Sequence, residues 1–95
     1  MRSRFIVAYD ISDTHRLRKT HRVLLGFGDP LQYSVFDCRL SDKEVTLLVM
    51  ALSEIINVKE DSVLLVKLGR ESQTSVRIRF LGKRIENEER KPLVI

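Results

Sequence analysis

A chain of 95 residues, with 43% hydrophobic and 32% charged residues, is long enough for one folded domain and too short for two. We therefore expect residues 1–95 to form a single domain. The longest nearly apolar run, residues 45–52, is far shorter than the roughly 20 residues of a membrane-spanning helix, which predicts no membrane partner. The 17 Lys and Arg residues exceed the 13 Asp and Glu residues, and the net charge of +4 is compatible with a phosphate-bearing partner.

The N-terminus and the cysteine content predict where the protein works. Residues 1–4 lead into an apolar strand-like run without the apolar core or cleavage site of a signal peptide. The single Cys38 has no second cysteine in the chain with which to form a disulfide. We therefore expect a cytoplasmic protein.

The first half of the chain predicts a strand, a helix and further strand. Phe5–Tyr9 is a continuous apolar run, typical of a strand buried on both faces in the middle of a sheet. Residues 12–14 supply helix-capping side chains, and Gly26 and Gly28, which tolerate the left-handed conformation, mark the expected end of the helix that follows. Asp29-Pro30 predicts a turn. Residues 31–40 alternate as a strand does, and predict either one long strand or two short ones around a kink.

The middle of the chain predicts a second helix and another strand. Ser41 and Glu44 have the spacing of a capping box, which opens a helix running to about Ile56. Its predicted core face comprises Val45, Leu48, Val49, Leu52 and Ile56. The apolar run 62–68 predicts a buried strand that ends at Gly69.

The C-terminal part predicts one or two more strands. Residues 76–80 alternate strictly, which places Arg77 and Arg79 on the outer side of a half-buried edge strand. Residues 86–95 are charged and then apolar, and an apolar end is unfavourable in water. We expect this tail to pair with the sheet of a partner protomer.

The predicted element order defines the fold class. Helices packed on one side of a mainly antiparallel sheet give an α+β, ferredoxin-like βαββαβ plait with an extra C-terminal strand. A domain this small gains stability from forming a homodimer.

Asp10 is the most informative polar position, because it directly follows a predicted buried strand. Two interpretations remain open. Asp10 either begins a turn beside a helix that Asp13 caps, or binds a hard cation such as Mg²⁺, which takes one or two protein carboxylates and keeps several waters. Two copies of Asp10 across a two-fold axis would make a better metal site than one.

Two acid-free basic segments are candidates for nucleic-acid binding. The first contains Arg16, Arg18, Lys19 and Arg22, and the second Arg77, Arg79, Lys83 and Arg84. Such charges can contact phosphates, but a solvated helix face or an edge strand protected from aggregation looks the same in sequence. Of the other candidates, His15 and His21 have no metal-ligand spacing, and Cys38 is expected to be a small core residue.

The segment Tyr9-Asp10-Ile11-Ser12-Asp13, with the basic Arg16-Leu17-Arg18-Lys19 after it, resembles the N-terminal signature of the Cas-two (Cas2) family of CRISPR-associated proteins. Phe27-Gly28 with Gln32-Tyr33-Ser34-Val35-Phe36 is similar to the second signature of that family, and residues 54–56 and 61–63 fit its following segments. The resemblance covers residues 4–69.

The resemblance implies a ferredoxin-like homodimer in which C-terminal strands pack on the partner. It implies that Asp10 is the catalytic residue and holds Mg²⁺ in an endonuclease, a phosphodiesterase acting on RNA or DNA during spacer acquisition. It also implies that Arg16, Arg18 and Lys19 bind nucleic acid. Arg77 and Arg79 would extend that surface.

Three functions remain open at this stage. The first is the metal-dependent endonuclease. The second is a non-catalytic nucleic-acid-binding adaptor that bridges dimers of the CRISPR integrase (Cas-one). The third is a regulatory ferredoxin-like module that binds a small ligand.

Overall fold

The computed structural model describes residues 1–70, 72 and 75–82. The elements in chain order are β1 (Ser3–Asp10), α1 (Thr14–Leu25), β2 (Gly28–Gln32), β3 (Val35–Leu40), α2 (Asp42–Ser53) and β4 (Ser62–Arg70). This order confirms the predicted α+β class and its βαββαβ arrangement. No helix among the described residues is long and apolar enough to cross a membrane.

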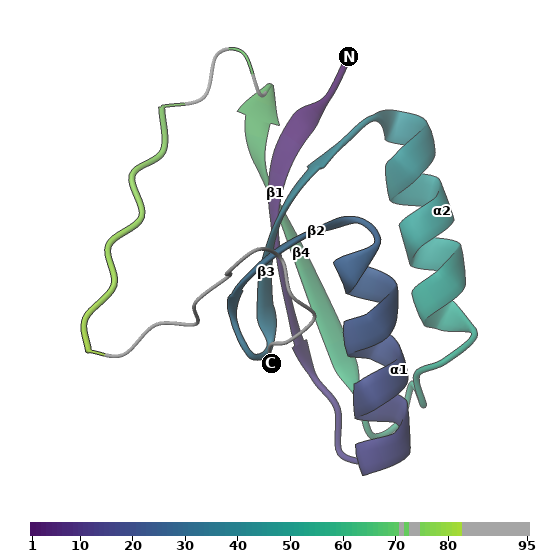
Figure 1. Cartoon of the computed structure of the whole chain (residues 1–95). Helices are drawn as coiled ribbons and strands as arrows, with labels where there is room; N and C mark the ends of the chain where they lie inside the picture. Colours follow the sequence, from purple (N-terminus) through teal and green to yellow (C-terminus); the bar gives the residue numbers. More distant parts are fainter. Residues whose placement is uncertain (71, 73–74, 83–95) are drawn as a thin grey trace.

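The four strands form one antiparallel sheet in the order β2-β3-β1-β4. Both helices lie side by side on one face of this sheet, and no helix of the described residues lies on the opposite face (Figure 1). The two faces are called the helix face and the open face below. β1 occupies a central position, as its continuous apolar sequence predicts.

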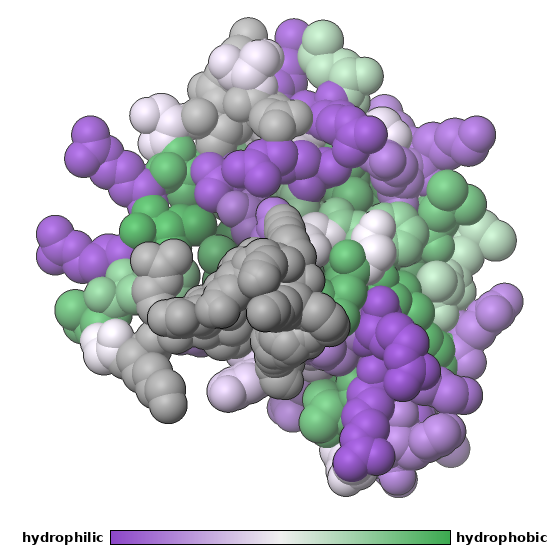
Figure 2. Space-filling model, viewed as in Figure 1, coloured by the Kyte–Doolittle hydropathy of each residue, from purple (hydrophilic) through white to green (hydrophobic). Residues whose placement is uncertain are grey.

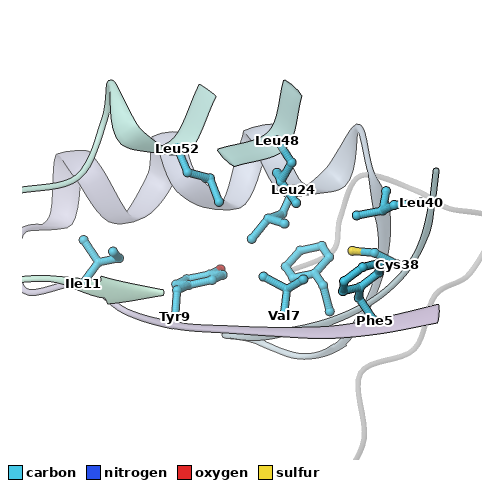
Figure 3. Packing of buried hydrophobic residues seen from close by; sticks show 10 residues of the cluster. Phe5, Val7, Tyr9, Ile11, Leu24, Cys38, Leu40, Leu48 and Leu52 are labelled. Atoms are coloured by element: carbon cyan, nitrogen blue, oxygen red, sulfur yellow. The ribbon is translucent and has the colours of Figure 1, made fainter. Parts of the chain in front are cut away.

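The core lies between the helices and the helix face. Alternate β1 residues Phe5, Val7 and Tyr9 are buried and point toward Leu24 of α1 and Leu48 of α2 (Figure 3). The remaining core residues are Ile11, Phe36, Cys38, Leu40 and Leu52. Because side chains alternate along a strand, the β1 residues between the core positions belong to the open face.

The start of α2 follows the predicted capping box. Ser41 Oγ accepts a hydrogen bond from Glu44 N, and Glu44 Oε1 accepts one from Ser41 N. The helix ends at Ser53, before the expected Ile56, and the prediction that Val49 is a core residue is wrong. Leu48 and Leu52 fill the core from one stripe of α2, so the residue after Leu48 is rotated toward solvent. Apolar residues reach the surface on the side of the molecule where α2 lies (Figure 2).

Residues 31–40 form two strands, with a turn at Tyr33 and Ser34 between β2 and β3. The predicted turn at Asp29-Pro30 is wrong, because both residues lie within β2. β2 is an edge strand, where the missing N–H of proline breaks no ladder of the sheet interior. Gly28 is required for close approach in this hairpin, since a Cβ there would lie 2.5 Å from Cys38 Sγ and 2.6 Å from the Asp37 carbonyl oxygen.

The predicted edge strand at 76–80 is absent. Residues 75–82 do not form a strand. These residues run outside the sheet, on the side opposite the helices (Figure 1). Alternation along the chain is not enough to form a strand, because a strand is stabilised by hydrogen bonds to a neighbouring strand. The predicted pairing of residues 86–95 with a partner protomer lies outside the described residues.

β4 forms where the apolar run predicted a strand, but only one of its faces is covered in the single chain. Leu64 is 59% exposed and Val66 is 40% exposed, while their neighbours Val63 and Leu65 pack against the core. The prediction of a fully buried strand is therefore wrong for one chain by itself.

Candidate functional site

Asp10 is the last residue of β1 and pairs in register with Ser62 of β4. Tyr9 faces the core, so Asp10 projects on the open face, where it is exposed. Among the described residues, no donor hydrogen-bonds to the Asp10 carboxylate. The helix cap is Asp13, whose Oδ2 accepts a hydrogen bond of 2.9 Å from Arg16 N. The capping role therefore belongs to Asp13, and Asp10 is left available for a ligand.

The nearby acids do not build a metal site within one chain. Within the described part of the chain, no three His, Cys, Asp or Glu side chains lie close enough together to hold a metal ion. Asp13 caps α1, Asp37 accepts two hydrogen bonds from Arg4, and Asp61 binds Arg16. Among the described residues at this site, one chain by itself therefore offers a metal ion only one available carboxylate, that of Asp10. It fits Mg²⁺ only if a second copy or substrate phosphates add oxygen ligands.

Asp61 is the centre of a hydrogen-bond network that the sequence analysis did not find. Its side chain is 0% exposed and accepts hydrogen bonds from Arg16 Nε (2.7 Å), Ser12 N (3.0 Å) and Asn57 N (2.8 Å). Arg16 Nη2 also contacts Glu60 Oε1 at 3.1 Å. We call these five residues the Asp61 network. The Arg16 guanidinium holds the pKa of the Asp61 carboxyl well below its ordinary value.

The Asp61 network joins the loop after β1 to the loop before β4. Ser12 lies two residues after Asp10, so the network fixes the backbone that leaves Asp10. This gives Arg16 a structural role that sequence reasoning did not assign. Its predicted contact with nucleic acid stays a prediction. No pattern in the sequence pairs Arg16 with an acid that lies 45 positions away.

The basic face of α1 remains available beyond Arg16. Arg18, Lys19 and Arg22 are exposed, and no carboxylate among the described residues forms an ion pair with them. Arg77 and Arg79 are exposed in the segment 75–82. Their predicted place on an edge strand is wrong for the single chain, and the sheet lies between their segment and α1 (Figure 1). The structure therefore does not bring Arg77 and Arg79 next to the basic face of α1 within one chain (Figure 1).

Tyr9 is a buried tyrosine with a fixed hydroxyl. The hydroxyl donates to the Tyr33 carbonyl oxygen at 2.8 Å and lies 2.9 Å from His21 Nδ1. Because its single proton goes to Tyr33, the Nδ1–H of His21 donates to Tyr9. Burial raises the pKa of Tyr9 to about 12, which makes this hydroxyl a poor proton donor or acceptor in catalysis near neutral pH.

The histidines and the cysteine behave as the sequence predicts. His15 is exposed, whereas His21 packs edge-on against Phe36 with ring centroids 5.3 Å apart. Burial lowers the pKa of His21, and its Nε2 is buried without a hydrogen-bond partner among the described residues. Cys38 is a buried core residue, and burial raises the pKa of its thiol to about 12.

Comparisons with known proteins identify the family to which this chain belongs. The family model of CRISPR associated protein Cas2 matches residues 1–76. The chain therefore belongs to the Cas2 family.

Two curated relatives match almost the whole length of this Cas2-family chain. "CRISPR-associated endoribonuclease Cas2 1" of Rhodospirillum rubrum is 34% identical over 91 residues, which cover 96% of this chain and 89% of the relative. "CRISPR-associated endoribonuclease Cas2" of Geobacter sulfurreducens is also 34% identical over 91 residues, with 96% of each protein covered. The crystal structure of Streptococcus pyogenes Cas2 superposes with a TM-score of 0.73 at 30% identity, covering 83% of this chain and 99% of that one. The Cas2 match includes Asp10 and the Asp61 network, and it ends just before Arg77.

Proposed function

We propose that this Cas2-family protein is a metal-dependent endonuclease, a phosphodiesterase on RNA or DNA, that acts as a homodimer in CRISPR spacer acquisition. The observation that carries the proposal is the exposed Asp10 carboxylate, which ends the central strand and accepts no hydrogen bond from the described residues. The endoribonuclease names of the two curated relatives support the nuclease class.

A homodimer is supported by the open face. Leu64 and Val66 of β4 are exposed there, and they pair in register with Ala8 and Ile6 of β1. A second copy packed on this face would remove these apolar side chains from water. Asp10 lies on the same face, so face-to-face packing would also place two Asp10 carboxylates at one interface.

Asp10 of each copy would hold Mg²⁺. When bound, the ion polarises the scissile phosphate and lowers the pKa of a coordinated water. The chain's own contribution is positioning and charge. β1 pairing and the Asp61 network hold the backbone on both sides of Asp10, while Arg18 and Lys19 attract the phosphate backbone of the substrate.

The decisive experiment is Asp10→Asn in the full chain, with cleavage of RNA and DNA measured in Mg²⁺ and in EDTA. Asn keeps the size of the side chain and removes the charge that binds a cation. We expect Mg²⁺-dependent cleavage to be lost while the circular dichroism spectrum is unchanged. Asp42→Asn, at the start of α2, is the matched control and should cleave normally. Undiminished cleavage by Asp10→Asn would refute the proposal.

A second candidate is the non-catalytic adaptor that bridges dimers of the CRISPR integrase. It is favoured by the small number of acids near Asp10, because no three His, Cys, Asp or Glu side chains of the described residues lie close enough together to hold a metal ion. On this view Asp10→Asn would leave spacer acquisition intact. Charge reversal at Arg77 or Arg79 would weaken binding of duplex DNA and lower its salt dependence. An acquisition assay on the same variants separates the two functions.

A further inference from the structure

A pocket of about 480 Å³ lies between α1 and the turn that joins β2 to β3. Its volume is typical of a site for a small molecule or for one unit of a polymer. Leu17 and Leu25 of α1 form apolar walls with Tyr33 and Ser34 of the turn, and Arg18 and Arg22 add positive charge. The proposed nuclease function uses Arg18 of this lining as a positive charge but assigns no role to the pocket itself.

The walls of the pocket are formed by exposed apolar side chains that do not belong to the hydrophobic core. Leu17 and Leu25 are exposed, and Tyr33 is 69% exposed. Leu17, His21 and Leu25 follow each other at four-residue spacing, so they form one stripe along α1. An exposed aromatic ring facing an apolar stripe suits a flat apolar ligand that stacks on the ring.

The positive charge of the pocket favours an anionic ligand. Among the described residues, the lining of the pocket includes Arg18 and Arg22 and no Asp or Glu. No carboxylate among the described residues pairs with either arginine. A ligand that complements this site therefore combines a flat apolar part with negative charge, as a nucleotide does.

The floor of the pocket is preformed. The Tyr9 hydroxyl links His21 of α1 to the carbonyl oxygen of Tyr33, with contacts of 2.9 and 2.8 Å. Tyr9 N also donates to the Ser34 carbonyl oxygen at 3.0 Å. These bonds hold the turn against β1 and α1, so the Tyr33 ring is presented from a fixed backbone.

The pocket lies at the end of β1 that carries Asp10. Tyr9 forms the floor of the pocket on the helix face, and the next residue, Asp10, projects on the open face. A nucleic-acid strand with one base in the pocket would have neighbouring phosphates close to the end of β1.

We propose that this pocket binds the base of an unpaired nucleotide, stacked on Tyr33 with its phosphate at Arg18 and Arg22. A base inside a duplex is stacked and paired, and is not free to enter such a pocket. The inference rests on the proposed nuclease function for its biological use, but base binding and cleavage are measured separately.

The test compares two labelled probes by fluorescence anisotropy with the full chain. One probe is single-stranded oligo(U) or oligo(dT) of about ten nucleotides. The other has the same length and phosphates but carries abasic sites in place of the bases. We expect the base-containing strand to bind about tenfold more tightly, which is the range of one stacked base. Comparison of the oligo(U) and oligo(dT) arms shows whether the pocket prefers RNA or DNA.

Substitutions then show which residue causes the preference for the base-containing probe. Tyr33→Ala should remove most of the difference between the two probes and Tyr33→Phe should keep it, because the Tyr33 backbone oxygen rather than its side chain holds the turn. Met50→Ala, an exposed apolar residue of α2 outside the pocket, is the matched control. Arg22→Gln should weaken binding of both probes more than Lys43→Gln does.

Three results would overturn the proposal. They are equal affinity of the wild-type chain for the two probes, a base preference that survives in Tyr33→Ala, and equally tight binding of a duplex of the same length. Asp10→Asn separates this inference from the nuclease proposal. Its base preference should match the wild type whether or not the protein cleaves.

Discussion

Asp10 and Asp61 lie at the same end of the sheet, because Asp10 pairs with the residue that follows Asp61. Their surroundings are opposite. Asp61 is fully buried and accepts hydrogen bonds from Arg16, Ser12 and Asn57. Asp10 is exposed and accepts none from the described residues. The fold thus uses one carboxylate for structure and keeps the other available for chemistry, and this division can be tested by changing each side separately.

The largest expected effect is on cleavage in Asp10→Asn. We expect the cleavage rate to fall by about a hundredfold or more, since the carboxylate that would hold Mg²⁺ is removed. The melting temperature should stay within about 2 °C of the wild type, as for other substitutions on the surface. Parallel activity and thermal unfolding assays check both parts. A large loss of stability would show that Asp10 has a structural role after all.

The second effect concerns the open face that carries Asp10. Leu64→Glu places a charge among apolar side chains, and we expect it to raise the dissociation constant of the homodimer by about a hundredfold. Cleavage should fall with it although Asp10 is intact. Analytical ultracentrifugation over a range of concentrations measures the change. Leu47→Glu on α2, which has similar exposure, should leave the association unchanged.

The third effect concerns Asp61, the buried carboxylate at the centre of the Asp61 network. Asp61→Asn leaves the Arg16 guanidinium without its buried charge partner, and we expect the melting temperature to fall by on the order of 10 °C. Glu60→Gln changes the exposed partner of the same arginine and should shift the melting temperature far less. If the two variants are equally stable, the Asp61 network does not hold the loops together.

The Asp61 network should also make the stability of the fold depend on pH in the acid range. The folded state lowers the pKa of Asp61 below its ordinary 3.8, so its contribution to stability is complete above that pH. It is lost as the pH falls further, because the unfolded chain then takes up a proton that the folded chain resists. Thermal unfolding of the wild type should therefore lose stability below about pH 4 more steeply than Asp61→Asn.

The smallest effect comes from His21. Burial lowers its pKa, so as the pH falls through 6.5 the unfolded chain binds a proton more readily than the folded chain does. The melting temperature should decrease by about 3 °C between pH 7 and pH 5. His21→Gln should reduce this slope, and the exposed His15→Gln should keep it. Equal slopes in both variants would assign the pH dependence to another group.

Local patterns predicted the parts of the fold that local physics determines. The apolar run of β1, the Asp13 and Ser41 caps and the spacing along both helices were sufficient for the element order. Asp29-Pro30 was misassigned as a turn, because an edge strand tolerates a proline that a central strand does not. The strand at 76–80 was predicted from alternation alone, although a strand also needs a neighbour to pair with.

The candidate site was predictable only in part, for a similar reason. Asp10 stood out by its place directly after an apolar strand, and its proposed chemistry came from the family resemblance. The link between Arg16 and Asp61 depends on two loops meeting in space, which no spacing along the chain encodes. The pocket beside Tyr33 was also missed, because it combines a helix stripe with a hairpin turn.

The central position of β1 has a consequence for biosynthesis. β1 leaves the ribosome before both of its neighbours in the sheet, β3 on one side and β4 on the other. The sheet cannot close around its centre until β4 has been translated, so its contacts are long in sequence and folding is delayed until most of the chain exists. A nascent chain that stops before Ser62 would leave one edge of β1 bare, with the apolar side chains of its open face beside unpaired backbone.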